Sequence, residues 1–400
     1  MIDICIITPG ILEARTQRGG GIEEQHYRVG LELSKYLHTV IISSFYKHFQ
    51  GQSLVNDNFM VEEVYFPSCK DYPPKSMVER YIIPFSMVLY SLLASIKIIS
   101  LAKRGLKIVI VTDILTGLLP AVLAKLLGVK VIFSEGNSWP WVNPYVVPMN
   151  LSVNQKIMYS TKILIGSLLA KVSNFIRVQS ASIKRGMVKN GIDHNKIVVI
   201  GPGIDTNMFK PTNKNDFSCM KFRIGFVGRL TDEKGSRLLF AVCKKAEKVI
   251  PEVSFMIMGG GPHEKLFKSL RNIEHIGWVP RITLPGFLSQ VQAVLFFQKD
   301  LGIAELEAMA SGKAVIACNT KGVSQIIKNM ENGLLCEPKA ASYVGAIKIL
   351  CQNHNLVRKL SYNARETALR NFSWDSVGMQ WVKLIFREMN YRWDILHVEV

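Results

Sequence analysis

The sequence has few cysteines, and no metal-binding spacing joins them. Its seven cysteines among 400 residues stand singly, without a CxxC pair or a Cys/His cluster. This pattern argues against both a zinc site and a disulfide framework. The HExxH and GxxxxGK[ST] motifs and any Ser/His/Asp arrangement are also missing, and the eight histidines are dispersed. The sequence therefore supports neither nucleophilic hydrolysis nor metal catalysis.

Acidic side chains are scarce beside basic ones. The chain has 31 Asp and Glu against 49 Lys and Arg, a formal net charge of +18. Such an excess suits a polyanionic partner: nucleic acid, an anionic membrane surface or a phosphorylated substrate. Charge alone does not choose among them. Because hydrophobic residues make up 48% of the chain, disorder is excluded, and the length predicts two domains.

Signals for export and for membrane crossing are also missing. The first ten residues, MIDICIITPG, begin with an apolar strand and lack the basic region of a signal peptide. The longest uncharged apolar stretch lies between Arg80 and Lys97, which is shorter than the roughly 18 residues that indicate a spanning helix. We therefore expect a cytoplasmic protein, with peripheral attachment to the inner face of a membrane as an open alternative.

Short apolar runs alternate with segments of helical period along the chain. The pattern predicts strands at Ile4–Thr8, Thr39–Ser43, Ile108–Thr112, Val129–Ser134, Phe175–Val178, Ile197–Ile200, Arg223–Val227, Ser254–Met258, Ala293–Phe297 and Ala314–Cys318. It predicts helices at Gly117–Leu127, Ala181–Asn190, Glu233–Val249, Ile303–Ser311, Ser342–Asn353 and Leu356–Asn371. Such alternation is typical of βα units on a parallel sheet. A polar stretch at about 205–221 reads as a linker, so we predict two doubly wound, Rossmann-like α/β domains facing across a cleft.

Glycines and cations follow several of these strands. Gly19-Gly20-Gly21 and Gly259-Gly260-Gly261 lack the spacing of the dinucleotide fingerprint, so each is either an anion-binding loop or an ordinary turn. Arg229 and Lys234, beside Gly228, stand where two cations could hold a diphosphate, although a solvated surface pair is the alternative. Glu305 and Glu307 lie two residues apart in a predicted helix, so only one can face the predicted cleft.

Taken in order, these segments resemble the retaining glycosyltransferases of family 4, which have the GT-B fold. The matching pieces are GGGIEE, VIGPGIDTNMFKP, GFVGRLTDEKG, MIMGGGP, HIGWVP, LGIAELEAMASGKAVIACNTKGVSQII and NGLLCEP. The segment FSWDSVGMQW resembles the family's final helix, which returns to the first domain. The resemblance covers about residues 2–390. It implies an acceptor domain over 1–205, a donor domain over 206–375 and a returning helix over 376–400.

The resemblance implies the transfer of a hexose from a nucleotide-diphosphate sugar, UDP- or GDP-linked, to a glycan or lipid-linked acceptor. No cofactor or metal is expected. Arg229 and Lys234 would clamp the diphosphate, and Glu307 would accept hydrogen bonds from the ribose. The remaining donor contacts implied are Gly20, Gly21, Gly228, Gly260, Trp278, Val279, Gly302, Ile303 and Ala304. Those at Trp278 and Val279 would hold the base through the backbone.

Two positions depart from the family's pattern. The first of its two glutamates, seven residues before the second, would fall at 299, where this chain has Lys299. Our hypothesis is that Asp300 takes its catalytic place; the alternative is a degenerate sugar pocket in a protein that binds nucleotide without transfer. After the strand ending at Ser134, the family's histidine is missing, and Glu135 or Asn137 could contact the acceptor, or simply cap the loop.

Two features of the first domain suggest a lipid-linked or membrane-surface acceptor. They are the apolar segment Tyr81–Ile99, followed by Lys103, Arg104 and Lys107, and the Trp139-Pro140-Trp141 loop with Tyr145. Apolar groups beside cations suit the interface of an anionic bilayer, although a buried helix and a packed loop are the alternative. A sugar-nucleotide epimerase would need proton-transferring groups that the sequence does not offer. Nucleic-acid binding would explain the charge but not the glycine loops, so no nucleic acid is expected.

Overall fold

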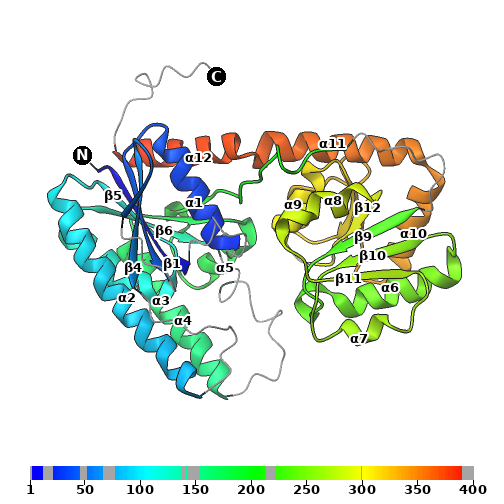
Figure 1. The fold of residues 1–400 in the computed structure, drawn as a ribbon, viewed down its shortest axis with the longest axis horizontal. Coiled ribbons are helices and arrows are strands. Elements are labelled where there is room, and N and C mark those ends of the chain that lie inside the picture. Colours follow the sequence, from blue (N-terminus) through cyan, green and yellow to red (C-terminus); the bar gives the residue numbers. More distant parts are fainter. Residues whose placement is uncertain are drawn as a thin grey trace. The chain divides into compact units, whose positions relative to one another are not determined.

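The computed structural model describes residues 2–11, 21–45, 52–65, 77–136, 141, 153–212, 222–298 and 300–389. Contacts divide the chain into two compact units (Figure 1). Unit 1 comprises Met1–Gly201 and Val377–Val400, and unit 2 comprises Pro202–Ser376. The helix α12 (Trp374–Met389) begins in unit 2 and continues in unit 1.

Unit 1 is built on an eight-stranded sheet with the spatial order β3-β4-β2-β1-β5-β6-β7-β8. The strands are β1 (Ile4–Ile11), β2 (Thr39–Phe45), β3 (Gln52–Asn56), β4 (Phe59–Tyr65), β5 (Ile108–Val111), β6 (Lys130–Glu135), β7 (Phe175–Val178) and β8 (Ile197–Val199). All pairings are parallel apart from the β3–β4 hairpin, which is antiparallel. The six strands predicted here are confirmed. The hairpin was missed because Glu62 and Glu63 interrupt the apolar run of β4, which lies next to the edge strand β3.

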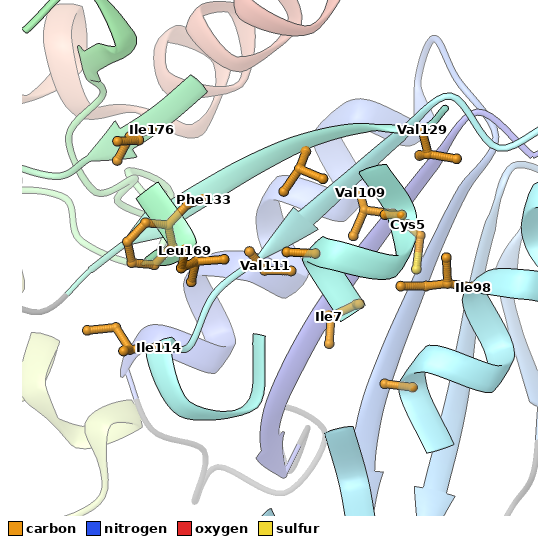
Figure 2. Packing of buried hydrophobic residues seen from close by; sticks show 14 of the residues in the cluster. Cys5, Ile7, Ile98, Val109, Val111, Ile114, Val129, Phe133, Leu169 and Ile176 are labelled. Atoms are coloured by element: carbon orange, nitrogen blue, oxygen red, sulfur yellow. The ribbon is translucent and has the colours of Figure 1, made fainter. Parts of the chain in front are cut away.

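Six helices are described in unit 1: α1 (Gly21–Ser34), α2 (Met77–Lys103), α3 (Ile114–Leu126), α4 (Val153–Val172), α5 (Ala181–Lys189) and the larger part of α12. The side chain of Asp113 begins α3 by accepting from the backbone N–H groups of Leu115 (3.0 Å) and Thr116 (2.8 Å). α3 packs between α2 and α4. Figure 2 shows how side chains of the strands, among them Val111 and Phe133, meet Ile98 of α2 and Leu169 of α4 in one core.

Unit 2 holds a six-stranded parallel sheet with the order β11-β10-β9-β12-β13-β14. The strands are β9 (Arg223–Val227), β10 (Ser254–Met258), β11 (Ile273–Gly277), β12 (Ala293–Leu295), β13 (Ala314–Cys318) and β14 (Leu334–Cys336). The helices are α6 (Ser236–Val249), α7 (Glu264–Phe267), α8 (Leu284–Ser289), α9 (Ile303–Ala310), α10 (Ala340–Gln352) and α11 (His354–Phe372). Separate apolar clusters cover the two faces of the sheet. The four strands predicted here are confirmed, and the short edge strands β11 and β14 were missed.

The order of strands in unit 2 fixes where a ligand site can form. The chain moves from β9 to β10 on one side, and later returns to place β12 on the other side of β9. At such a switch point the loops after the two central strands diverge and leave a crevice at the carboxyl end of the sheet. The loops after β9 and β12 contain Lys234 and Gly302, both of which the sequence selected.

Candidate functional site

The loops after β9 and β10 lie against each other through glycine backbone. A Cβ atom on Gly259 would stand 1.9 Å from the carbonyl oxygen of Gly228, and one on Gly261 would stand 2.6 Å from that of Leu230. The N–H of Leu230 donates to the carbonyl of Gly260 at 2.9 Å. Both outer glycines have positive φ angles, +140° and +156°. Only glycine therefore fits at these two positions, and the site is lined by main chain.

Trp278 directly follows β11, the strand next to β10 in the sheet. The N–H of Gly259 donates to the carbonyl of Gly277 at 2.8 Å, and a Cβ on Gly260 would lie 3.9 Å from the Cβ of Trp278. The indole is 73% exposed, whereas Val279 packs against the core of unit 2. The structure thus brings Gly228, Gly260 and Trp278 together at one edge of the sheet.

Lys234 reaches from the β9 loop to the β12 loop. Its Nζ donates to the side-chain carbonyl of Gln298, whose amide donates to Oε1 of Glu305. Oε2 of Glu305 accepts from the N–H of Gly302 at 3.0 Å. Glu305 is buried, and burial raises its pKa, while Lys234 and the backbone N–H groups act in the opposite direction. The Lys234–Gln298–Glu305 chain therefore fixes the ammonium group at the switch point, and the sequence alone did not reveal Gln298 or Glu305 as its partners.

Gly235 separates Lys234 from the helix that follows. We expected a helix from Glu233, but Asp232–Lys234 form a 3₁₀ turn and α6 begins only at Ser236. Between them Gly235 has φ +72° and ψ 27°, a left-handed conformation. A Cβ there would lie 2.4 Å from the Cβ of Phe297. The glycine thus lets the lysine turn back over the end of β12.

Arg229 stands at the surface in this structure. Its Nη2 lies 3.2 Å from Oε2 of Glu233, and the two side chains are 70% and 61% exposed. An exposed pair of this kind contributes about 0–1 kcal/mol, so Arg229 can leave Glu233 to bind an anion at little cost. Among the predicted cations, Lys234 is held in place, and Arg229 is not.

The two glutamates of α9 have different partners. Glu307 is buried, and its Oε1 accepts from Nε of Arg281 at 2.7 Å and pairs with Nη2 of the same residue. The Arg281 guanidinium also lies 5.5 Å from the centre of the Phe209 ring. Arg281 was not selected from the sequence, because nothing in its loop indicated a buried partner.

The remaining donor contacts lie where α9 begins. Asp300 and Gly302 precede the helix, and Ile303 and Ala304 form its first turn. The N–H groups of a first turn have no carbonyl within the helix to bond, so those of Ile303 and Ala304 suit an anionic ligand. The N–H of Gly302 is already bonded to Glu305. Lys299 lies outside the described residues.

In unit 1, Glu135 lies at the carboxyl end of β6. It is buried and accepts from Nε1 of Trp141 at 2.9 Å. Beside it, Nε2 of His26 is 2.9 Å from Oγ of Ser134. Gly21 is the first residue of α1, whereas Gly20 and Asn137 lie outside the described residues.

The structure decides between the alternatives for one membrane feature and corrects another. Trp141 is buried in the core, where a Cβ on Gly166 would meet its ring at 2.7 Å, so the packed-loop alternative holds for this residue. The other loop residues, Trp139, Pro140 and Tyr145, lie outside the described residues. The apolar segment was judged too short to span a membrane, but α2 continues past Lys97, and Phe85–Lys103 is long and apolar enough by length and composition. Less than half of that stretch is buried.

No group of three or more His, Cys, Asp or Glu side chains that could hold a metal ion occurs in the part of the chain that the structure describes. The expectation that no metal takes part stays a prediction.

Comparison with known proteins gives the unit 2 site a context. Residues 209–367 match the family model of the glycosyl transferases group 1. The chain is 26% identical over 267 residues to a phosphatidylinositol N-acetylglucosaminyltransferase subunit of Arabidopsis thaliana, and the match covers 62% of this chain and 56% of that protein. The chain spans about half to two thirds of the length of this relative and of three others that it matches.

Two solved structures resemble the chain over nearly its whole length. Sucrose-phosphate synthase from Thermosynechococcus elongatus has a TM-score of 0.73 at 16% identity, covering 98% of this chain and 99% of that one. HepE of Anabaena, solved in complex with UDP, has a TM-score of 0.70 at 14% identity, covering 97% and 100%. The chain has the GT-B fold, as predicted.

Proposed function

We propose that this protein is a retaining glycosyltransferase, which moves a hexose from a UDP- or GDP-linked sugar to a glycan or lipid-linked acceptor. The observation that supports this most directly is the switch point of unit 2. There a fixed lysine, Lys234, stands beside glycine loops inside a glycosyl transferases group 1 domain. Binding of UDP in the Anabaena structure of the same fold favours a nucleotide donor.

In the proposed reaction, the bond between the anomeric carbon and the β-phosphate oxygen breaks, and its electron pair stays on the diphosphate. Lys234 and Arg229 stabilise the charge that develops there, since preorganised cations act most strongly on charge formed in the transition state. The acceptor hydroxyl bonds to the same face of the anomeric carbon and passes its proton to the departing phosphate.

The other residues position the donor. The N–H groups of Ile303 and Ala304 approach the donor, and the backbone at Trp278 and Val279 holds the base. Glu307 accepts hydrogen bonds from the ribose hydroxyls, while Arg281 holds its carboxylate in position. Asp300 takes the place of the glutamate that the family has at position 299, and Gly20, Gly21, Glu135 and Asn137 of unit 1 meet the sugar or the acceptor. We further propose a cytoplasmic protein that attaches peripherally to a membrane.

Nucleotide binding is tested first, with UDP, GDP and ADP in a thermal-shift assay. A ligand that binds only the folded state, present at 100 times its dissociation constant, adds about 2.7 kcal/mol of stability. We expect one nucleotide to stabilise the protein and Lys234→Ala to remove the effect. The matched control is Lys248→Ala, an exposed lysine in the last turn of α6, which changes the charge equally. Equal loss of binding in both variants would contradict a site at the switch point.

Transfer is then tested with sugars of the nucleotide that binds. The release of nucleoside diphosphate and the anomeric configuration of the product, read by NMR, report turnover and retention. Unchanged turnover in Asp300→Ala would rule out the catalytic place given to Asp300. The presence of Lys299 favours a second candidate, a nucleotide-binding protein with a degenerate sugar pocket. That candidate predicts nucleotide binding with no release from any donor sugar.

A further inference from the structure

The outer face of α2 is apolar over four turns. Its exposed large side chains are Phe85, Val88, Leu92, Ile96 and Ile99, each between 39% and 66% exposed. Their spacings of three, four, four and three residues place them in one stripe along the helix. Lys103 stands four residues after Ile99, where the same stripe reaches the end of the helix.

The inner face of α2 carries the large side chains of Tyr90, Ile98 and Leu101 together with several small ones. Ser86, Ser91, Ala94 and Ser95 are buried, and Oγ of Ser91 donates to the carbonyl of Thr116 in α3 at 3.0 Å. A surface helix of a globular protein normally directs its large apolar side chains inward and its polar ones outward. In α2 bulky apolar side chains lie on both faces, and those of the outer face remain exposed.

The neighbouring helices extend this apolar surface. α3 packs between α2 and α4, and Figure 1 shows the three helices together in unit 1. Further large side chains are exposed on these helices. They are Leu115, Leu119 and Leu126 of α3, Leu127 directly after α3, and Ile157, Leu164 and Leu168 of α4. We call these twelve residues of α2, α3 and α4 the three-helix face. Apolar patches of such extent mark interaction sites in soluble proteins.

Over the stretches of the three helices that carry this face, the charges have one sign. Phe85–Lys103, Ile114–Leu126 and Val153–Val172 contain no aspartate or glutamate. Lys103, Lys125 and Lys171 occupy the last turns of α2, α3 and α4 respectively. Because each helix leads into a strand of the same parallel arrangement, the three last turns lie at one edge of the sheet. A row of lysines therefore borders the three-helix face.

We propose that the three-helix face is a docking surface for an anionic lipid bilayer. The apolar side chains enter the boundary between headgroups and acyl chains, and the lysines reach the anionic headgroups with their stems along the apolar surface. This rests on the peripheral attachment proposed above and names the surface that makes it. The surface lies on unit 1 and does not depend on the nucleotide site of unit 2. It also replaces the buried Trp141 with α3 and α4 as the membrane contact.

A spanning role for α2 is not compatible with its inner contacts. Tyr90, Ala94 and Ile98 belong to the core of unit 1, and Nζ of Lys97 lies 3.1 Å from Oε2 of Glu62, whose side chain is 4% exposed. Withdrawing the helix would open that core and leave a buried carboxylate without its cation. A second copy of the chain is a poor partner as well, since it would set an acid-free, lysine-bordered surface against itself.

The experiment is vesicle flotation of the full chain. We expect binding to vesicles of phosphatidylcholine with 30% phosphatidylglycerol at low salt, and much weaker binding to phosphatidylcholine alone or in high salt. The triple variant Val88→Ser/Leu92→Ser/Ile96→Ser should weaken the partition into anionic vesicles about 100-fold, since each partly inserted side chain contributes about fivefold. Replacing Lys103 and Lys171 by glutamine should weaken it about tenfold or more.

The chain offers a matched control for the triple variant. Leu54, Val249 and Ile349 are 65%, 50% and 47% exposed and lie outside the three-helix face, so replacing them by serine removes the same three residue types. We expect this control to bind vesicles as the unchanged protein does. Both triple variants should keep the nucleotide-induced thermal shift and the circular dichroism spectrum, because exposed positions contribute little to the core.

Three results would overturn the proposal. The first is equal binding of the triple variant and its control. The second is equal binding to neutral and anionic vesicles, which would remove the role of the lysines. The third is a dimer in sedimentation that the face variant alone dissociates, without vesicle binding. A failure of nucleotide binding with intact vesicle binding would reject the transferase proposal and leave this one standing.

Discussion

Replacing Gly235 by alanine tests how Lys234 is held at the switch point. Two costs add at this position. Alanine in a left-handed conformation (φ +72°) costs about 1–2 kcal/mol. The new Cβ would also lie 2.4 Å from Cβ and 3.1 Å from Cγ of Phe297. Because a Cβ cannot rotate away, the end of β12 must move, and such overpacking costs about 1–3 kcal/mol. We expect a total of about 2–5 kcal/mol.

The same change at Gly277 separates the two costs. Gly277 has φ +79° and no atom within 4 Å of an added Cβ, so Gly277→Ala bears only the backbone cost, about 1–2 kcal/mol. The measurement is native-state hydrogen exchange of peptides from β9 and β12, which reports the opening of unit 2. Nucleotide binding should weaken as well, because Phe297 directly precedes the glutamine that Lys234 contacts. Equal loss of protection in the two variants would refute the contact with Phe297.

Three further changes test charges in unit 2. Burial lowers the pKa of Lys313 to about 8. Between pH 8 and 10.5 the unfolded state therefore binds more protons than the folded state, so the free energy of unfolding should rise with pH, by up to about 3 kcal/mol. Lys313→Met should remove this rise and increase the urea midpoint at pH 7. A double-mutant cycle of Arg281→Met and Glu307→Gln, followed by urea unfolding, should give a coupling energy of about 1–3 kcal/mol, and a value near zero would contradict the buried pair. Gln298→Leu should cost about 1–3 kcal/mol in urea unfolding by removing a donor from the buried Glu305 carboxylate, whereas an unchanged midpoint would argue against that bond.

Most of the central strands could be predicted from the sequence, for a physical reason. A strand covered on both faces, such as Phe175–Val178 or Ala314–Cys318, must be almost entirely apolar, and its sequence shows this directly. The edge strands β3 and β11 and the neighbouring β4 were missed because polar residues such as Glu62 and Glu274 interrupt their apolar runs, and β14 has only three residues. The edge strand β8 was predicted, because all three of its residues are apolar.

The glycines of the site could be selected from the sequence, but their purpose could not. Gly259 and Gly261 were ambiguous between a turn and an anion loop, and the structure shows that both admit the neighbouring β9 loop. Arg281, Gln298 and Glu305 were not selected as site residues, since each acts through a partner from another loop. A contact between residues 64 positions apart, such as Lys234 and Gln298, leaves no periodic signal in the chain.

The helix α2 shows why hydrophobicity alone does not tell which face of a helix is buried. Large apolar residues recur around the helix, so a reading by apolar period finds no clear inner face and favours full burial. Both faces carry large apolar side chains: Tyr90, Ile98 and Leu101 are buried. Phe85, Leu92 and Ile96 are exposed on the outer face. Contact between water and the five exposed apolar side chains of the outer face is unfavourable. Docking on a bilayer would remove these side chains from water, which is the energetic reason for the proposed surface.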